Sequence, residues 1–145
     1  MDTTANKKLD RRYIDDVLNG CKLNVIDEIC AENYISHIPG MPDMDREGDK
    51  QLIGSMHAAF PDLRFEVGAQ IAEGDRVLHT LIGRGTHRAE FMNIPATGKT
   101  IEVTGMNINR IANGKIAESW GVIDVLGLLQ QLGVVPTPGG EPSAV

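Results

Sequence analysis

Apolar residues in the first 60 positions recur every three or four residues, which is the spacing of an amphipathic helix. Three such stripes predict helices over residues 9–18, 25–30 and 45–60. Asn19-Gly20 ends the first helix, and the proline and glycine residues of "HIPGMP" interrupt the chain before the third. The first part of the chain is therefore predicted to be helical.

After Pro61 the pattern changes to an alternation of apolar and polar residues, which predicts β-strands. We expect strands over residues 64–71, 76–88, 101–111 and 115–125, followed by a short helix over 125–132. Helices followed by four antiparallel strands predict an α+β fold in which the helices pack on one face of a curved sheet.

The chain has 145 residues, which suits one domain with its own core. We expect a single domain over residues 1–133. The segment 134–145, "VVPTPGGEPSAV", is rich in proline and glycine and is predicted to be a flexible tail.

Two turns fit the "ANG" segment at 112–114, and they place different side chains on one face of the last hairpin. A two-residue loop at "NG" puts Arg110 and Asp124 on opposite faces. A three-residue loop over 112–114 pairs Arg110 with Ile116 and puts Arg110 and Asp124 on the same face. We favour the three-residue loop, although Asn-Gly is also the strongest signal for the two-residue one.

With the three-residue loop, one face of the hairpin combines large apolar walls with a few ionisable groups, as small-molecule pockets do. That face consists of Thr104, Met106, Ile108, Arg110, Ile116, Glu118, Trp120, Val122 and Asp124. The other face has smaller side chains, which suit packing against helices or another subunit: Val103, Gly105, Asn107, Asn109, Ala117, Ser119, Gly121 and Ile123. The first face is therefore the predicted pocket wall.

Composition argues against several kinds of partner. The formal net charge is −6 and the lysines and arginines are scattered, which disfavours nucleic acid or an anionic membrane. No apolar run approaches the roughly 20 residues of a membrane span, and "MDTTANKKLD" lacks the apolar core of a signal peptide. We therefore expect a soluble cytoplasmic protein, with Cys21 and Cys30 as reduced thiols.

Asp124 is a carboxylate in the most apolar part of the second half, "SWGVIDVLGLLQQLG". Because a buried, unpaired carboxylate is costly, Asp124 is expected to be hydrogen-bonded or functional. Desolvation beside Trp120 would make it an effective general base. Asp124 also stands directly before a short helix, where an aspartate caps backbone amides. Both roles stay open.

Other ionisable residues have similar pairs of explanations. Arg110 on a pocket face would hold an anionic or enolate oxygen, while Glu118 is a candidate counter-ion. His37, after the extended "YIS", is a predicted pocket residue, and His57 lies on the inner stripe of the third helix, where a core histidine is the alternative. No metal-site spacing occurs among the four histidines His37, His57, His79 and His87. "GRGTH" lacks a dinucleotide fingerprint, so we expect neither metal nor cofactor.

Four segments in order, "FPDLRFEV", "EGDRVLHTLIGRGTHRAEFMNIPATGKTIEV", "INRIANGKIAESWGVID" and "LLQQLG", resemble the SnoaL-like polyketide cyclases of the nuclear transport factor 2-like superfamily. The resemblance runs from about Leu9 to Gly133. It implies a cone-shaped α+β barrel, in which a strongly curved antiparallel sheet and N-terminal helices enclose a pocket.

The resemblance also implies a reaction. The family's cyclases close an aromatic polyketide ring by intramolecular aldol condensation without metal or cofactor, and Asp124 matches their general acid/base. They pair this aspartate with a histidine fourteen residues earlier, where this chain has Arg110. Related members act as cofactor-free hydroxylases or isomerases, and the superfamily includes non-catalytic ligand-binding or dimerisation modules, so these stay as alternatives.

Together, the residues and the resemblance predict a cofactor-independent enzyme of aromatic polyketide biosynthesis that forms a homodimer or higher homo-oligomer. The predicted catalytic residues are Asp124, His37 and Arg110. The predicted substrate-binding residues are Trp120, Met106, Ile108, Glu118, His57, Phe60 and Tyr34.

Overall fold

A computed structural model describes residues 2–136 of the protein, so most of the predicted tail, residues 137–145, lies outside the described residues. The helices are α1 (Thr3–Arg12), the π-helix η1 (Tyr13–Asn19), α2 (Val25–Ile29), α3 (Arg46–Ala59) and α4 (Val125–Gln131). The strands are β1 (Cys30–His37), β2 (Arg64–Glu73), β3 (Arg76–Thr86), β4 (Thr100–Ala112) and β5 (Lys115–Ile123). The predicted α+β class is confirmed.

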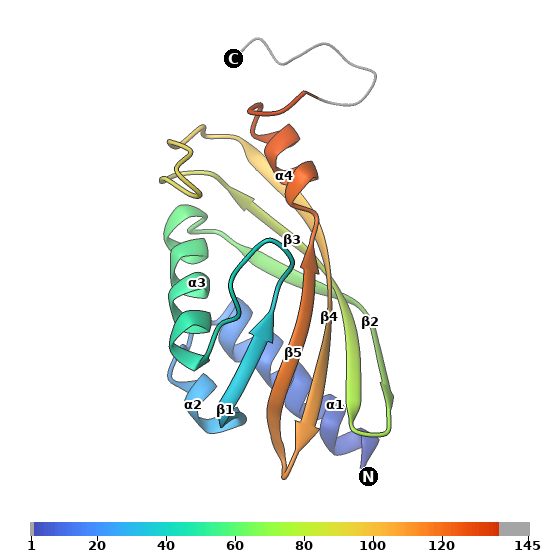
Figure 1. Cartoon of the computed structure of the whole chain (residues 1–145). Coiled ribbons are helices and arrows are strands. Elements are labelled where there is room, and N and C mark those ends of the chain that lie inside the picture. The colour runs from blue at the N-terminus through green and yellow to red at the C-terminus, as the bar shows by residue number, and fades with distance from the viewer. Residues whose placement is uncertain (1, 137–145) are drawn as a thin grey trace.

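The strands form one curved, unclosed sheet in the order β1-β5-β4-β3-β2 (Figure 1). Strands β2 to β5 pair antiparallel, as predicted. The sequence analysis missed β1, which runs parallel to β5 and forms one edge of the sheet. Cys30 continues the helical stripe of α2, and exposed polar residues occupy the middle of the strand, so the alternation of β1 is hard to recognise.

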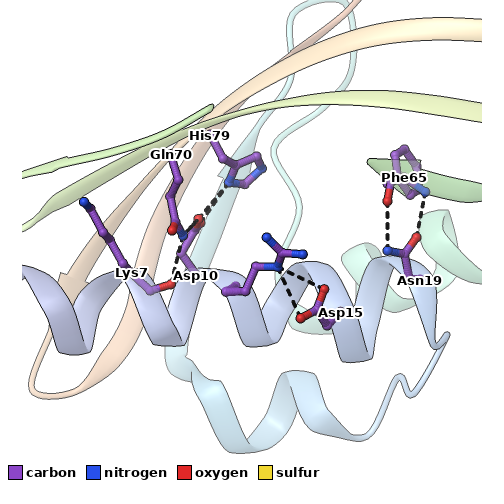
Figure 2. A network of polar contacts seen from close by, with 8 residues as sticks. Lys7, Asp10, Asp15, Asn19, Phe65, Gln70 and His79 are labelled. Atoms are coloured by element: carbon purple, nitrogen blue, oxygen red, sulfur yellow. Dashed lines mark hydrogen bonds and ion pairs between the residues drawn. The ribbon is translucent and has the colours of Figure 1, made fainter. Parts of the chain in front are cut away.

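The N-terminal helices lie on the concave side of the sheet, with α1 crossing its lower half (Figure 1). Asp2 caps α1 by accepting the backbone amides of Thr4 and Ala5. At the end of η1, the Asn19 side chain donates to the carbonyl of Phe65 at 3.0 Å and accepts its amide at 2.7 Å (Figure 2). This side chain therefore acts like a strand partner and ties the helical layer to β2.

The core on the concave side divides into two apolar clusters. The lower cluster joins η1, α2 and α3 to the sheet and contains Tyr13, Val17, Val25, Ile26, Ile29, Cys30, Tyr34, Ile53, Val77, Ile111 and Ile116. The upper cluster joins the end of α3 to β4 and α4 and contains Ala59, Phe60, Ile101, Leu128 and Leu132. The middle of the concave face lies between them.

The β4–β5 hairpin turns at Asn113 and Gly114, whose φ values are 53° and 72°. Two consecutive positive φ values are typical of a type I′ turn, and Ala112 pairs with Lys115. The loop therefore has two residues, and the predicted three-residue loop is wrong. The Asn-Gly signal was the better guide.

A β-bulge follows the turn and shifts the register by one residue. Ile111 pairs with Ile116, but the next pair is Arg110 with Glu118, which leaves Ala117 as the extra residue on β5. Because of this shift, Arg110 and Glu118 lie on the same face, as the three-residue loop had predicted. Ile116 lies on the opposite face, against the prediction.

The predicted pocket wall is the outer face of the sheet, away from the helices. Arg110, Glu118 and Trp120 share this face, but Met106 and Val122 on it are 57% and 56% exposed. Apart from Ile116, the side chains of the hairpin are grouped on this face as predicted, but the enclosed side was assigned to the wrong set. The set with smaller side chains faces the helices.

Candidate functional site

Asp10 of α1 is completely buried against the concave face (Figure 2). Its carboxylate accepts hydrogen bonds from Nδ1 of His79 at 2.9 Å, Nδ2 of Asn109 at 2.7 Å and Nε2 of Gln70 at 2.8 Å. A buried carboxylate needs donors in place of water, and side chains from three strands supply them. Asp10 is therefore fully paired.

The hydrogen bonds continue across β4 and β5. Asn107 donates to Oδ1 of Asn109 at 2.9 Å, and the hydroxyl of Ser119 donates to Oδ1 of Asn107 at 2.8 Å. The hydrogen bonds from Ser119 to Asn107, from Asn107 to Asn109 and from Asn109 to Asp10 all run in the same direction, so each hydrogen bond polarises the next. These residues form what we call the concave polar network: Asp10, Gln70, His79, Asn107, Asn109 and Ser119.

The strand register assembles this network, because side chains alternate between the two faces of a sheet. His79 of β3 pairs with Asn107 of β4, and Asn109 of β4 pairs with Ser119 of β5. All four therefore face the helices. Asp10 completes the network because it lies on the inward side of α1, one turn before the buried Tyr13.

A second buried carboxylate, Asp49 of α3, lies in the same layer. The hydroxyl of Tyr13 donates to its Oδ2 at 2.6 Å, and the hydroxyl of Tyr34 reaches the same oxygen at 3.5 Å. Burial raises the pKa of Asp49 in spite of these donors, and burial also raises the pKa of Tyr13 and Tyr34 well above their usual range. The predicted substrate-binding residue Tyr34 is thus on the concave side, bound to α3.

The concave face has an unfilled position at Gly105, in the middle of β4. A Cβ on Gly121 would lie 2.9 Å from Oδ1 of Asn107, so the amide fills that position. A Cβ on Gly105 would meet one atom within 4 Å, the carbonyl oxygen of Val122 at the tight distance of 3.3 Å, and nothing else on the concave side. We call the open space over Gly105 the Gly105 gap.

Apolar side chains flank the Gly105 gap, and the concave polar network lies at its lower end. Leu81 and Ile123 are the cross-strand neighbours of Gly105, and Asn107 follows two residues later on β4. Ile123 faces inward yet is 39% exposed, so the gap opens to solvent at this edge. Asn107 has a second amide hydrogen beyond the one given to Asn109 and can donate it to a ligand.

His87, at the upper end of the concave side, is completely buried and stacks on Phe60. Its Nδ1 accepts the amide of Thr97 at 3.2 Å, so its Nε2 carries the hydrogen. Within residues 2–136 nothing accepts that hydrogen, and such an unpaired donor costs about 1–3 kcal/mol. His87 pairs with Lys99, six positions and roughly 20 Å from Gly105, so it lies outside the gap.

Three predicted site residues meet on the outer face. The carboxylate of Glu118 accepts hydrogen bonds from Nε2 of His37 at 2.7 Å and from a guanidinium nitrogen of Arg110 at 3.2 Å. The carboxylate of Asp43 contacts Nδ1 of His37 at 2.9 Å. Hydrogen bonds to Glu118 and then Asp43 raise the pKa of His37, and the bond to His37 lowers the pKa of Glu118. Glu118 is therefore the counter-ion that the sequence suggested.

Trp120 extends this outer cluster. Its ring stacks with His37 at 5.7 Å between centroids, and the guanidinium of Arg76 lies 4.9 Å from the ring centroid. Ile108 pairs with Trp120 on the same face. These side chains cover one another on the outside of the sheet, so the expectation that they line an enclosed pocket is wrong.

Asp124 is exposed and caps α4 by accepting the amide of Gly127 at 2.9 Å. Gly127 has no side chain, which leaves room for the carboxylate over the first turn. The expectation that Asp124 is buried is wrong, and the capping alternative describes its contacts. The backbone amide of Asp124 donates to the carbonyl of Thr104 on β4. Thr104 and Arg110 are six positions apart on this strand, which corresponds to roughly 20 Å. The predicted catalytic residues Asp124 and Arg110 are therefore not brought together.

His57 and Phe60 share the concave side with Tyr34. Nε2 of His57 donates to the carbonyl of Leu18 at 2.6 Å, which matches the core-histidine alternative, and Phe60 belongs to the upper cluster. The predicted residues thus separate into a concave group (Tyr34, His57, Phe60), an outer group (His37, Met106, Ile108, Arg110, Glu118, Trp120) and Asp124 at the rim.

The sequence analysis missed the concave polar network. A signal was present, because Asp10 is a carboxylate between the apolar positions Leu9 and Tyr13, the same feature that drew attention to Asp124. His79 was placed on a long strand, but the sequence did not show that α1 would cover it. The partner of a buried charge becomes visible only after helix and sheet are packed.

Two shallow surface hollows of ≈360 and ≈370 Å³ lie elsewhere, one beside Arg11 and Phe65, the other beside Tyr34 and Met44. Over the described range, no three histidine, cysteine, aspartate or glutamate side chains gather closely enough to hold a metal ion. None of the helices in that range has the length and apolar character needed to cross a membrane.

The family model of the SnoaL-like polyketide cyclases matches residues 8–132, which is most of the chain. The chain belongs to this family. Members of the SnoaL-like family are also found among its structural neighbours, and a search of curated proteins found no significant match.

Two solved structures combine high structural similarity with moderate identity. AclR from Streptomyces galilaeus, proposed to be a hydroxylase, is 27% identical with a TM-score of 0.84, over 93% of this chain and 100% of AclR. IdmH from Streptomyces antibioticus, proposed to be a polyketide cyclase, is 31% identical with a TM-score of 0.78, over 89% of this chain and 99% of IdmH.

The hairpin register changes how the acid/base pair of SnoaL-like cyclases is carried over to this chain. A histidine and an aspartate fourteen residues apart face each other across β4 and β5 only at the positions of Asn107 and Gly121. Arg110 and Asp124 have the same separation but do not face each other. At these two facing positions the protein has Asn107, whose side chain is a neutral amide, and Gly121, which has no side chain. Neither residue can transfer a proton as an acid or a base.

The outer cluster predicts a pH-dependent contribution of His37 to stability. Because its pKa is raised in the folded state, the stabilisation is complete below the unfolded pKa of about 6.5 and is lost as the pH rises through the folded value. In urea unfolding, the difference in free energy of unfolding between the wild type and His37→Gln should be largest near pH 6 and shrink toward pH 9. The variant Arg84→Gln, which removes a non-titrating outer cation, should show a constant difference; a constant difference for His37→Gln would contradict the prediction.

Proposed function

We propose that the protein is a cofactor-independent enzyme that removes a proton from a flat, oxygenated carbon acid of the aromatic polyketide class. The observation that carries this proposal is the Gly105 gap, an open apolar position on the concave face that ends at the concave polar network. Membership of the SnoaL-like family supports the polyketide class of substrate. Likeness to AclR and IdmH supports an enzyme rather than a binding module.

Ring closure, hydroxylation and isomerisation of such a substrate share one first step, the formation of an enolate. A carbon acid next to a carbonyl loses its proton more easily when a donor stabilises the developing enolate oxygen and when water is kept from the carbanion. Asn107 donates one amide hydrogen to Asn109, and we expect its second amide hydrogen to donate to the enolate oxygen at the lower end of the gap. Leu81 and Val103 would cover the ring faces of the substrate.

Ring closure is the first candidate for the step after deprotonation. In an aldol closure the enolate carbon attacks a carbonyl of the same molecule, and the new alkoxide takes up a proton. IdmH is proposed to be a polyketide cyclase, which supports ring closure for this chain. A cyclase needs a group that returns the proton to the alkoxide.

Hydroxylation is the second candidate, and the pair Asn107 and Gly121 favours it. The substrate enolate supplies the electron pair for a C–O bond to molecular oxygen, and the hydroperoxide that forms loses water to leave a carbonyl. This route therefore needs the deprotonation but no external reductant and no enzyme acid at the facing positions. AclR is proposed to be a hydroxylase, which supports an oxygen-dependent reaction for this chain. Isomerisation by proton return to another carbon would use the same first step.

The oligomeric state and a cytoplasmic location stay predictions. We expect a homodimer or higher homo-oligomer, and the outer face provides apolar side chains for it, since Ile71, Met106 and Val122 are exposed. Sedimentation measures this state directly.

The enzyme class can be tested with 1,8-dihydroxyanthrone, a flat carbon acid whose C10 proton is exchangeable. Without oxygen, in deuterated buffer, we expect the protein to accelerate deuterium exchange at C10 above the buffer rate, as measured by NMR. In air, oxygen uptake and formation of 1,8-dihydroxyanthraquinone would assign hydroxylation, whereas exchange without uptake favours cyclisation or isomerisation. Exchange at the buffer rate for this probe would contradict the proposed function.

A side chain that fills the Gly105 gap should weaken ligand binding with little effect on the free energy of unfolding. We expect Gly105→Val to change the free energy of unfolding by no more than about 1 kcal/mol, because the strand preference of a β-branched residue is opposed by the 3.3 Å approach of its Cβ to the carbonyl oxygen of Val122. The added side chain occupies the ligand position, so the dissociation constant for 1,8-dihydroxyanthraquinone should rise at least about tenfold, as 1.4 kcal/mol corresponds to that factor. Thr104→Val, on the same strand but facing outward, is the control, and equal affinity of both variants would place the substrate elsewhere.

The role of Asp124 as a general base stays a prediction, and its cap can be measured beside it. We expect Asp124→Ala to lower the free energy of unfolding by about 1 kcal/mol, while Asp124→Asn keeps most of the cap. Urea unfolding measures both. If Asp124→Asn unfolds like the wild type and binds the quinone normally but no longer exchanges the anthrone proton, Asp124 is the base; retained exchange leaves it as a cap.

A further inference from the structure

We propose that His79, held by Asp10, is the general base that takes the substrate proton at the lower end of the Gly105 gap. This inference rests on the proposed function and names the group that performs its first step. It starts from a feature that packing alone does not require: a histidine and an aspartate buried together, 1% and 0% exposed, between α1 and the sheet.

The partners of Asp10 determine which nitrogen of His79 carries the hydrogen. Oδ1 of Asp10 accepts from Asn109 at 2.7 Å and from Nδ1 of His79 at 2.9 Å, and Oδ2 accepts from Gln70 at 2.8 Å. With three donors directed at it, the carboxylate is held in its acceptor form. Nδ1 of His79 therefore carries the hydrogen, and Nε2 has a free lone pair directed away from Asp10.

The register brings His79 close to the Gly105 gap. His79 pairs with Asn107, and Gly105 is the diagonal neighbour of His79 on β4. Diagonal neighbours on one face of a sheet are roughly 7–8 Å apart, which a histidine side chain and a ligand over the glycine can span. In the part of the chain that the structure describes, no protein group is paired with Nε2 of His79.

The proton transfer then balances without any other reactant. The C–H bond of the substrate breaks, its proton goes to Nε2, and its electron pair moves into the enolate, whose oxygen accepts the free amide hydrogen of Asn107. The imidazolium that forms is compensated by Asp10, 2.9 Å from Nδ1. Asp10 touches no substrate and is a positioning residue: it fixes the tautomer and balances the charge.

Replacing His79 by asparagine tests the proposal, because the asparagine amide can still donate to Asp10 but has no counterpart of Nε2. We expect His79→Asn to bind 1,8-dihydroxyanthraquinone within about threefold of the wild type. Its anaerobic exchange of 1,8-dihydroxyanthrone should fall by about 100-fold or more, the usual contribution of a general base. Circular dichroism and urea unfolding check that the variant is folded.

His87→Asn is the matched control. His87 is equally buried, lies on the same side, and is also held through Nδ1, where asparagine can still accept the amide of Thr97. This control should exchange the anthrone proton like the wild type. If His79→Asn also does so, the proposal is overturned while the proposed function stands; if the wild type itself exchanges at the buffer rate, the proposed function fails and this proposal with it.

A spectroscopic measurement tests the tautomer without turnover. In protein labelled with ¹⁵N-histidine, with the His79 signals assigned from their absence in His79→Asn, Nδ1 should bear the hydrogen and Nε2 should not. Binding of 1,8-dihydroxyanthraquinone should shift the Nε2 signal. Asp10→Asn should weaken the preference for this tautomer and lower exchange, with quinone affinity retained. A hydrogen on Nε2 in the unliganded wild type would overturn the proposal even if the enzyme is active.

Discussion

The need to pair one buried carboxylate links most elements of this fold. Asp10 has no exposure, and an ionised carboxylate without water requires several donors. Gln70, His79 and Asn109 supply them from three neighbouring strands, so α1 can lie on the sheet in only one orientation without leaving a charge unpaired. Burial of apolar side chains brings the two layers together, and this polar contact determines how they are aligned.

A single extra residue in β5 then determines what the two faces present. The type I′ turn alone would put Arg110 and Glu118 on opposite faces, but the bulge at Ala117 brings them together as an ion pair. The same shift keeps Asn109 opposite Ser119 on the concave side. A register change of one residue reverses every side chain beyond it, so the polar network and the outer cluster both depend on this bulge.

The element types and the antiparallel order of the last four strands, though not their register, could be read from local periodicity, because each depends on residues close in sequence. β1 could not, since an edge strand that pairs parallel with a segment some 80 residues away leaves little local pattern. The bulge has no sequence signal beyond the ambiguous "ANG". The grouping of Arg110, Glu118 and Trp120 was nevertheless predicted, whereas their exposure was not, because alternation tells which side chains share a face but not which face the helices cover.

The distribution of unfavourable features is an independent argument for a function on the concave side. A glycine in mid-strand costs roughly 0.5–1 kcal/mol relative to alanine, and a Cβ on Gly105 would meet a single atom, the carbonyl oxygen of Val122 at 3.3 Å. Asp49 is buried where its pKa is raised. On the outer face, by contrast, Glu118 is paired on both sides by His37 and Arg110. Sequences selected for stability alone would fill the gap and avoid a buried carboxylate of raised pKa, so a chain that keeps these costs on one side is using that side for binding or catalysis.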